Sequence, residues 1–177
     1  MEGFCFYWVF IVMKYIITES QYKLITEQED DVLYIPSVDA VGGWDNLQKF
    51  LERRGNPDYR LGESFVSTRM DNENIESLGN LISIEEGLYL MGTESLKTLG
   101  KLKYVGGVCD LFMSKIESLG DLEYVGAFLD IRYTNVSSLG KLTHVRDLYA
   151  AGTPLAKKYT RDEIRKMINI EGELVLV

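Results

Sequence analysis

Residues 109–128 read CDLFMSKIESLGDLEYVGAF and residues 129–148 read LDIRYTNVSSLGKLTHVRDL, and the two segments align without a gap. Apolar or small residues stand at the same seven positions of both segments, counted from Cys109 and from Leu129. The Leu-Gly dipeptide they share also begins at Leu78 and Leu99, so it recurs at steps of 20 or 21 residues. A period this short is typical of stacked supersecondary units, and the repeat therefore decides the fold.

The shared spacing is L-x-L-x-x-T-x-I-x-x-L-x-x-L-x-x-V, and residues 88–105 follow it with one residue inserted after Thr93. This spacing resembles the leucine-rich repeat, with Thr or Ser where that family usually has Asn. The resemblance covers about two thirds of the chain. It implies a solenoid with a parallel β-sheet and an extended binding surface, but it does not imply an activity.

Each repeat is predicted to form one short strand, because the residue between Leu129 and Ile131 points away from both. A single unit cannot bury its own leucines, so the units must stack and align their strands in parallel. Glycines such as Gly106 and Gly126 precede the strand, where the chain must turn sharply. A hydroxyl recurs at one bend, where it can bond the backbone of a neighbouring turn. These hydroxyl residues are Thr93, Ser114, Thr134 and Thr153.

The expected fold is an α/β repeat in two regions. Residues 1–60 form an N-terminal region with an apolar leader, a short strand and helix, and a capping helix over residues 44–54. In that helix Asp45 is the predicted cap and Gln48 closes a capping box. Residues 61–177 form the leucine-rich-repeat-like solenoid and its C-terminal cap, and the helix at 44–54 hides the leucines of its first unit.

Both ends of the repeat array carry further signals. Val32 to Ile35 favours a strand that ends at Pro36. Thr160 and Glu163 predict a capping box, followed by a helix whose inward residues are Ile164, Met167 and Ile168. Beyond that helix, Leu174 and Leu176 repeat the spacing of Leu88 and Leu90, which predicts one final strand.

The apolar run from Phe4 to Met13 is too short to span a bilayer. Glu2 precedes it and no small-residue cleavage site follows, so no secretory signal is recognisable. Three interpretations stand open: a buried strand or helix, a membrane-associating segment, or a true translation start at Met13 that leaves residues 1–12 outside the protein.

The sequence after Met13 favours a strand over Lys14 to Ile17, a capping box of Thr18 with Gln21, and a helix to about Gln28. This opening resembles small uncharacterised proteins of tailed bacteriophages, and the ending of the chain resembles phage-encoded repeat proteins. The resemblance implies a protein of the host cytoplasm or of the virion. It also implies the second functional hypothesis, a structural or assembly component of a bacteriophage.

Charge and cysteine content exclude several classes of function. The formal net charge is −8 and the pI about 4.8, which disfavours binding to nucleic acid and docking on anionic lipid. Cys109 occupies a core position of the repeat, and its spacing from Cys5 indicates neither a zinc site nor a disulfide framework. A reducing compartment fits two such thiols.

No catalytic constellation is recognisable. His144 is the only histidine and is expected on a solvent-facing turn. The Gly106-Gly107 pair is a repeat turn rather than a phosphate loop. Acidic residues such as Asp110 and Asp130 recur with the repeat, without the ligand spacing of a calcium loop. We therefore expect a protein that is not an enzyme and has no cofactor and no metal.

The predicted outward face of the repeat strands is the candidate binding surface for a protein partner. It combines aromatic residues and Met with Asp and Arg, the types enriched at interface centres. The predicted site residues are Tyr89, Met91, Asp110, Phe112, Asp130, Arg132 and Tyr149. Their flanking residues are Val108, Met113, Phe128, Tyr133 and Asp147. In the alternative interpretation, the segment from Phe4 to Val12 folds over this face.

The predicted C-terminal helix is basic within an acidic protein. Its positive residues are Lys157, Lys158, Arg161, Arg165 and Lys166. A solvated helix face and a contact with an anion or an acidic partner are both compatible with this pattern.

Overall fold

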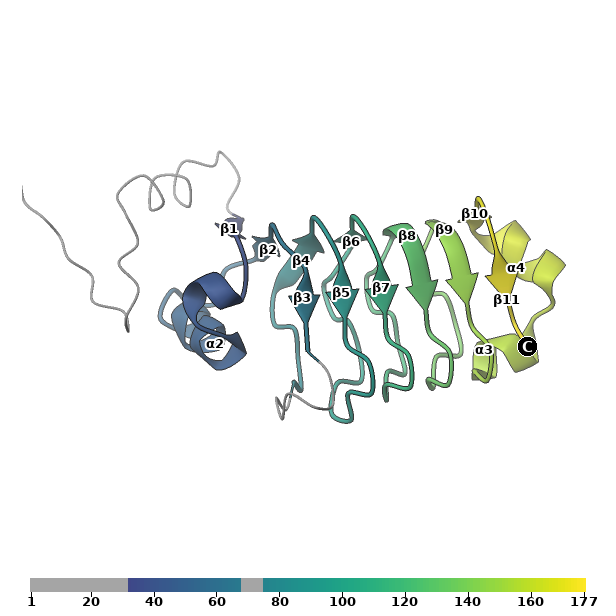
Figure 1. Cartoon of the computed structure of the whole chain (residues 1–177), viewed down its shortest axis with the longest axis horizontal. Coiled ribbons are helices and arrows are strands. Elements are labelled where there is room, and N and C mark those ends of the chain that lie inside the picture. Colours follow the sequence, from purple (N-terminus) through teal and green to yellow (C-terminus); the bar gives the residue numbers. More distant parts are fainter. Residues whose placement is uncertain (1–31, 68–74) are drawn as a thin grey trace, which may run out of the picture.

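The computed structural model describes residues 32–67 and 75–177, and over these residues the chain is an α/β fold with an open, parallel sheet and few helices. Figure 1 shows strands in a row along the long axis, with α2 at one end and α3 and α4 at the other. The predicted α/β class and parallel sheet are confirmed.

The elements follow one another along the chain with short strands throughout the repeats. They are β1 (Leu33–Ile35), η1 (Asp39–Val41), α2 (Trp44–Glu52), β2 (Tyr59–Leu61), β3 (Phe65–Val66), β4 (Leu81–Ile84), β5 (Leu88–Tyr89), β6 (Tyr104–Val105), β7 (Cys109–Asp110), β8 (Tyr124–Asp130), β9 (His144–Tyr149), α3 (Pro154–Lys158), α4 (Arg161–Met167), β10 (Asn169–Ile170) and β11 (Leu174–Val175).

The strands form two ladders, each pairing successive repeats in parallel. The first ladder runs β1-β2-β4-β6-β8-β9-β10, and the second runs β3-β5-β7-β8-β9-β11. Strands β8 and β9 are long enough to belong to both ladders. Pairs such as Tyr104 with Tyr124 and Cys109 with Leu129 join residues one repeat apart, as the sequence period requires.

The prediction of one strand per repeat is wrong, because each full unit contributes strand residues to both ladders. The additional strand precedes the glycine turn, where Tyr104 is exposed and Val105 buried. The turns themselves stack closely: a Cβ on Gly106 would lie 1.9 Å from the carbonyl oxygen of Glu85. A Cβ on Gly126 would lie 2.1 Å from the carbonyl oxygen of Gly106. Glycine at these turns lets the backbone keep pairing on both sides.

The repeat leucines form one continuous core, and the predicted register of apolar positions is confirmed. Each of the seven positions in the units starting at Leu88, Cys109 and Leu129 is buried. Cys109 lies among them, and burial raises the pKa of its thiol well above the usual value. The thiol therefore packs as a small apolar group.

Hydroxyl groups bond the backbone at two bends of the repeats, with one exception. The buried Ser114 hydroxyl, at the first of these bends, has no hydrogen-bond partner among the described residues. Thr93, Thr134 and Thr153 donate to the carbonyl oxygen three residues earlier at 3.1, 2.7 and 2.6 Å. Each of these bonds therefore closes the turn to which the residue itself belongs. The prediction of a bond to a neighbouring turn is wrong. The second bend precedes each Leu-Gly pair, where a Ser or Thr hydroxyl accepts the glycine amide at 3.0 or 3.1 Å. Such bonds favour turns over helix.

Helix α2 covers the start of the second ladder. The ring of Trp44 stacks on Phe65 with centroids 4.8 Å apart, and Leu47 and Leu51 are buried. The predicted Asp45 and Gln48 capping box is wrong, since the N-cap is Gly43 and makes no side-chain bond. The helix ends at Glu52, two residues earlier than predicted.

The C-terminal prediction of a helix followed by a final strand agrees with the structure. Thr160 and Glu163 form the expected capping box of α4, and Ile164 is buried. Met167 was predicted to face inward but is 49% exposed. Beyond α4, β10 and β11 each pair with β9, so the last residues extend both ladders.

Several predictions lie outside the described residues. They concern the apolar run and the start at Met13, the strand and helix over residues 14–28, and Cys5. Within the described ranges, the protein has no helix of the length and apolar character needed to cross a membrane.

Candidate interaction site on the second ladder

The outward residues of the second ladder form two neighbouring rows. Tyr89, Asp110, Asp130 and Tyr149 are register neighbours on consecutive repeats and make up the first row. The second row stands two residues further along the chain and consists of Met91, Phe112 and Arg132. The candidate binding surface predicted from the sequence is therefore two rows wide, because Phe112 and Arg132 lie beside the Tyr89–Tyr149 row and not within it.

Asp130 and Arg132 form a tightly bonded ion pair in this face. Asp130 is only 3% exposed, and the Arg132 Nε donates to both of its carboxylate oxygens at 3.0 Å. A second guanidinium nitrogen also donates to Asp130, and these bonds raise the pKa of Arg132 above its usual value. Arg132 therefore satisfies and covers a carboxylate that the sequence had placed on an open surface.

Aromatic rings flank the guanidinium of Arg132. It lies 5.1 Å from the ring centroid of Phe112 and 5.5 Å from that of Tyr149. Phe112 meets Tyr133 edge-on at 5.8 Å, and Tyr149 meets Phe128 edge-on at 5.7 Å. These contacts hold the aromatic residues in fixed orientations, as a preformed interface requires.

Asp110 is the half-buried carboxylate of the same face that has no cation. Its Oδ1 accepts the amide N–H of Phe112 at 3.0 Å, and within the described residues it forms no ion pair. Burial raises the pKa of Asp110, the charge of Asp130 adds to this, and the Phe112 amide and Arg132 oppose it. A positive group placed next to Asp110 would lower the pKa of its carboxyl group and so oppose the increase caused by burial.

Two bulky side chains project from the bend next to this face. Met113 and Tyr133 are 56% and 61% exposed, and their backbones are left-handed, with φ of 57° and 58°. The equivalent bends of the repeats on either side carry Gly92 and Gly152, with φ of 68° and 75°. A left-handed backbone costs a residue with a large side chain free energy that glycine does not lose. The sequence carried a sign of this strain that the prediction missed, because glycine occupies the equivalent position of the neighbouring repeats, at Gly92 and Gly152.

The remaining predicted flanking residues have structural partners or partial burial. Asp147 accepts the Glu173 amide at 2.7 Å and pairs with Arg146. Tyr149 donates to Glu173 at 3.3 Å. Val108 and Phe128 are half-buried.

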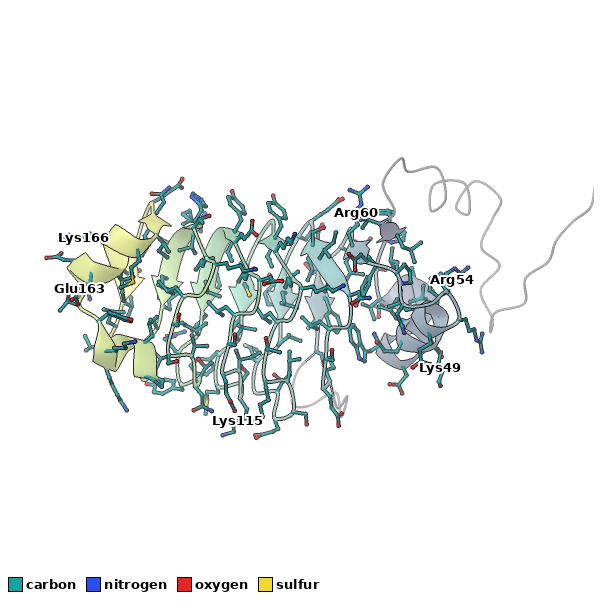
Figure 2. All side chains as sticks on the ribbon, turned by 180° about the vertical axis from the view of Figure 1, so that it is seen from behind. Lys49, Arg54, Arg60, Lys115, Glu163 and Lys166 are labelled. Carbon is teal, nitrogen blue, oxygen red and sulfur yellow. The ribbon has the colours of Figure 1, made fainter. Side chains whose placement is uncertain are left out.

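The basic residues lie on two helices, α3 and α4, and not on the single helix predicted, because the chain is extended at Tyr159 and Thr160 between them. The arginines of α4 bond the protein's own backbone. Arg165 donates to the carbonyl oxygens of Ile170 and Gly172 at 3.0 and 2.8 Å, and Arg161 donates to that of Leu174. These two arginines satisfy the hydrogen-bonding capacity of backbone carbonyl groups at the end of the sheet. Lys157, Lys158 and Lys166 are exposed, and Figure 2 shows Lys166 and Glu163 at the opposite end of the molecule from Lys49 and Arg54.

The outward face of the first ladder carries a stack of rings that the sequence analysis missed. Tyr104, Tyr124 and His144 stack in register with centroid distances of 5.0 and 4.7 Å. The signal was available, because an aromatic residue precedes the buried valine in three consecutive repeats. His144 is thus held between Tyr124 and Asn169 and does not stand on a free turn.

The protein has a further concave surface, near helix α2. A shallow cleft of about 360 Å³ lies between α2 and the first repeats, lined by Gln48, Leu51, Asn56, Pro57, Gly79 and Asn80. Over residues 32–67 and 75–177, no group of three or more His, Cys, Asp or Glu side chains is arranged to hold a metal ion.

Comparison of the chain with protein-family models, curated proteins and solved structures found no match in any of the three.

Proposed function

We propose that the protein is a leucine-rich-repeat-like solenoid capped at its N-terminal end by α2. Three observations support this architecture. Strand pairs join residues about one sequence period apart, the seven repeat positions are buried, and Trp44 of α2 stacks on Phe65 of the first β3–β5 pair. Stacked units of this kind expose one sheet face along the whole array.

The proposed function is non-catalytic binding of a protein partner through the outward face of the second ladder. The observation that carries it is the pair Met113 and Tyr133, two exposed side chains on strained left-handed backbone beside Phe112 and Asp110. Folding alone favours Gly or Asn at such positions, so a bulky apolar residue there points to a role outside folding. Met and aromatic residues are also the types that carry binding energy at interfaces.

The test uses substitutions that relieve strain while removing the exposed side chains. Met113→Asn and Tyr133→Asn place at each bend a residue that tolerates the left-handed conformation. The double variant is expected to melt at or above the wild-type temperature and to lose a partner that the wild-type protein captures from its native source. Mass spectrometry identifies that partner, and its affinity for both purified proteins is then measured directly.

The matched control removes an exposed aromatic residue from the other ladder. Tyr104→Ser deletes a ring that is 43% exposed on the first ladder and leaves the second ladder unchanged. We expect Tyr104→Ser to keep full partner affinity. Equal affinity of the Met113→Asn/Tyr133→Asn variant and the wild type would contradict binding through the second ladder.

A further inference from the structure

Asp110 and Asp130 hold equivalent positions in adjoining repeats, but only Asp130 is bonded to a guanidinium group. Each accepts with Oδ1 the amide N–H of the residue two places further along, at 3.0 Å in both cases. Asp130 also binds the guanidinium of that residue, Arg132. The residue two places after Asp110 is Phe112, which carries no charge. One repeat therefore contains a complete carboxylate–guanidinium pair, and the preceding repeat contains the carboxylate without the cation.

We propose that Asp110 receives the guanidinium of an arginine in the protein partner, at the position that Arg132 takes against Asp130. The inference rests on the proposed function and specifies the chemistry of the partner. The in-chain pair serves as its template, because the backbone bond that orients the carboxylate is the same in both repeats.

The surroundings of Asp110 also favour arginine. Tyr89 is its register neighbour on one side, and the ring of Phe112 stands in the adjacent row. Around Asp130 the guanidinium likewise has two aromatic neighbours, Phe112 and Tyr149. A planar, weakly hydrated guanidinium stacks on rings and at the same time forms paired bonds to a carboxylate, whereas an ammonium group cannot form such paired bonds.

The charge balance of the face is complementary to such a partner. Asp110, Asp130 and Arg132 together carry one uncompensated negative charge, and the whole chain carries −8. A half-buried carboxylate without a cation is unfavourable, so an arriving guanidinium gains both the ion pair and the relief of that penalty. The acidic surface also increases the rate of encounter with a basic partner.

The test is an NMR titration that does not require the natural partner. The probe is acetyl-Gly-Arg-Gly-amide, and the matched probe is the same peptide with citrulline, which has the same shape without the charge. The Phe112 amide reports directly, because it donates to Asp110. We expect a saturable shift of this resonance with the arginine peptide, at about fivefold higher affinity than with the citrulline peptide.

Two variants identify the carboxylate responsible. Asp110→Asn keeps an oxygen that can accept the Phe112 amide and is expected to remove the preference for arginine. Glu117→Gln changes the net charge equally at an exposed position and is expected to keep it. Equal shifts with arginine and citrulline in the wild-type protein, or a preference that survives in Asp110→Asn, would overturn the inference.

Partner capture separates this inference from the proposed function. If Asp110→Asn binds the captured partner as tightly as the wild type while Met113→Asn/Tyr133→Asn does not, the face binds a protein but Asp110 does not receive its arginine. If neither variant affects capture while the peptide titration shows the arginine preference, the cation site stands and the proposed partner surface fails.

Discussion

Among the described residues, the buried carboxylate of Asp130 forms an ion pair with one cation, Arg132. Arg132→Ala leaves Asp130, 3% exposed, with only backbone bonding, and we expect a loss of about 2–3 kcal/mol in the free energy of unfolding. The expected loss lies below that of a fully buried pair, because the Arg132 side chain is 40% exposed. Adding Asp130→Asn should recover most of the loss in urea denaturation. A double variant no more stable than Arg132→Ala would show that the arginine acts through packing alone.

The carboxylate of Asp110 makes the stability of the protein depend on pH. Burial raises its pKa in the folded protein, so folding favours the protonated carboxyl and the charged form destabilises the protein at neutral pH. This destabilisation disappears as the pH falls through the raised pKa. Asp110→Asn should therefore be at least as stable as wild type at pH 7, and the difference should vanish in acid. Melting temperatures between pH 3 and pH 7 measure it, and a less stable Asp110→Asn at pH 7 contradicts it.

At the scale of the element, the Leu-Gly turns stack on one another with unequal clearance. Gly120 and Gly140 have nearly the same φ, 60° and 59°. A Cβ on Gly120 would lie 2.4 Å from the carbonyl oxygen of Gly100, whereas one on Gly140 would lie 3.6 Å from that of Gly120. Both alanine substitutions add the same left-handed strain, of order 1 kcal/mol, but only Gly120→Ala forces two turns apart. Thermal unfolding should show the larger loss for Gly120→Ala, and equal losses would mean that the turn spacing adjusts freely.

The last strands depend on the helix that precedes them. Arg165 donates to the carbonyl oxygen of Ile170, the last residue of β10, and to that of Gly172, which lies between β10 and β11. Arg165→Ala should cost about 1–3 kcal/mol and increase hydrogen exchange in β10 and β11. Lys166→Ala, one residue along and exposed, is the control and should change neither quantity. If exchange is unchanged in Arg165→Ala, the strands are held by their pairing with β9 alone.

At the scale of the whole molecule, one apolar core runs from α2 to β11. Leu119 is 1% exposed near its middle, and Leu119→Ala should cost about 2–5 kcal/mol. Because the core is continuous, amide exchange should increase together at Leu61 and Val145, which lie in repeats far from the substitution. Faster exchange confined to the repeats around Leu119 would mean that the two ends unfold independently.

The sequence predicted those features that depend on residue type at fixed spacing. Leucine periodicity gave the buried positions and the parallel pairing, and Thr160 with Glu163 gave the cap of α4. The first ladder was missed, because a two-residue strand such as β6 has no periodicity of its own. The start of α2 was misassigned, since Gly43 caps it through backbone conformation and not through a side chain.

The candidate site was predicted in composition but not in geometry. Tyr89, Asp110, Asp130 and Tyr149 lie in strands of the second ladder, and Met91, Phe112 and Arg132 lie just beyond them. The burial of Asp130, however, depends on the side-chain direction of Arg132. The strain at Met113 and Tyr133 is likewise a property of backbone angles. The contrast between Asp110 and Asp130 becomes visible only when both bonding patterns are known.

The ring stack on the first ladder contains a natural NMR probe, the imidazole of His144. His144 is the only histidine of the chain, and its ring stacks on Tyr124. Its Nδ1 lies 3.0 Å from the side-chain amide nitrogen, Nδ2, of Asn169 in β10. Its imidazole C–H protons therefore give one assignable pair of signals in an unlabelled sample, displaced by the ring current of Tyr124. Release of β10 from β9, whether by heat, truncation or substitution, moves those two signals and can be timed directly.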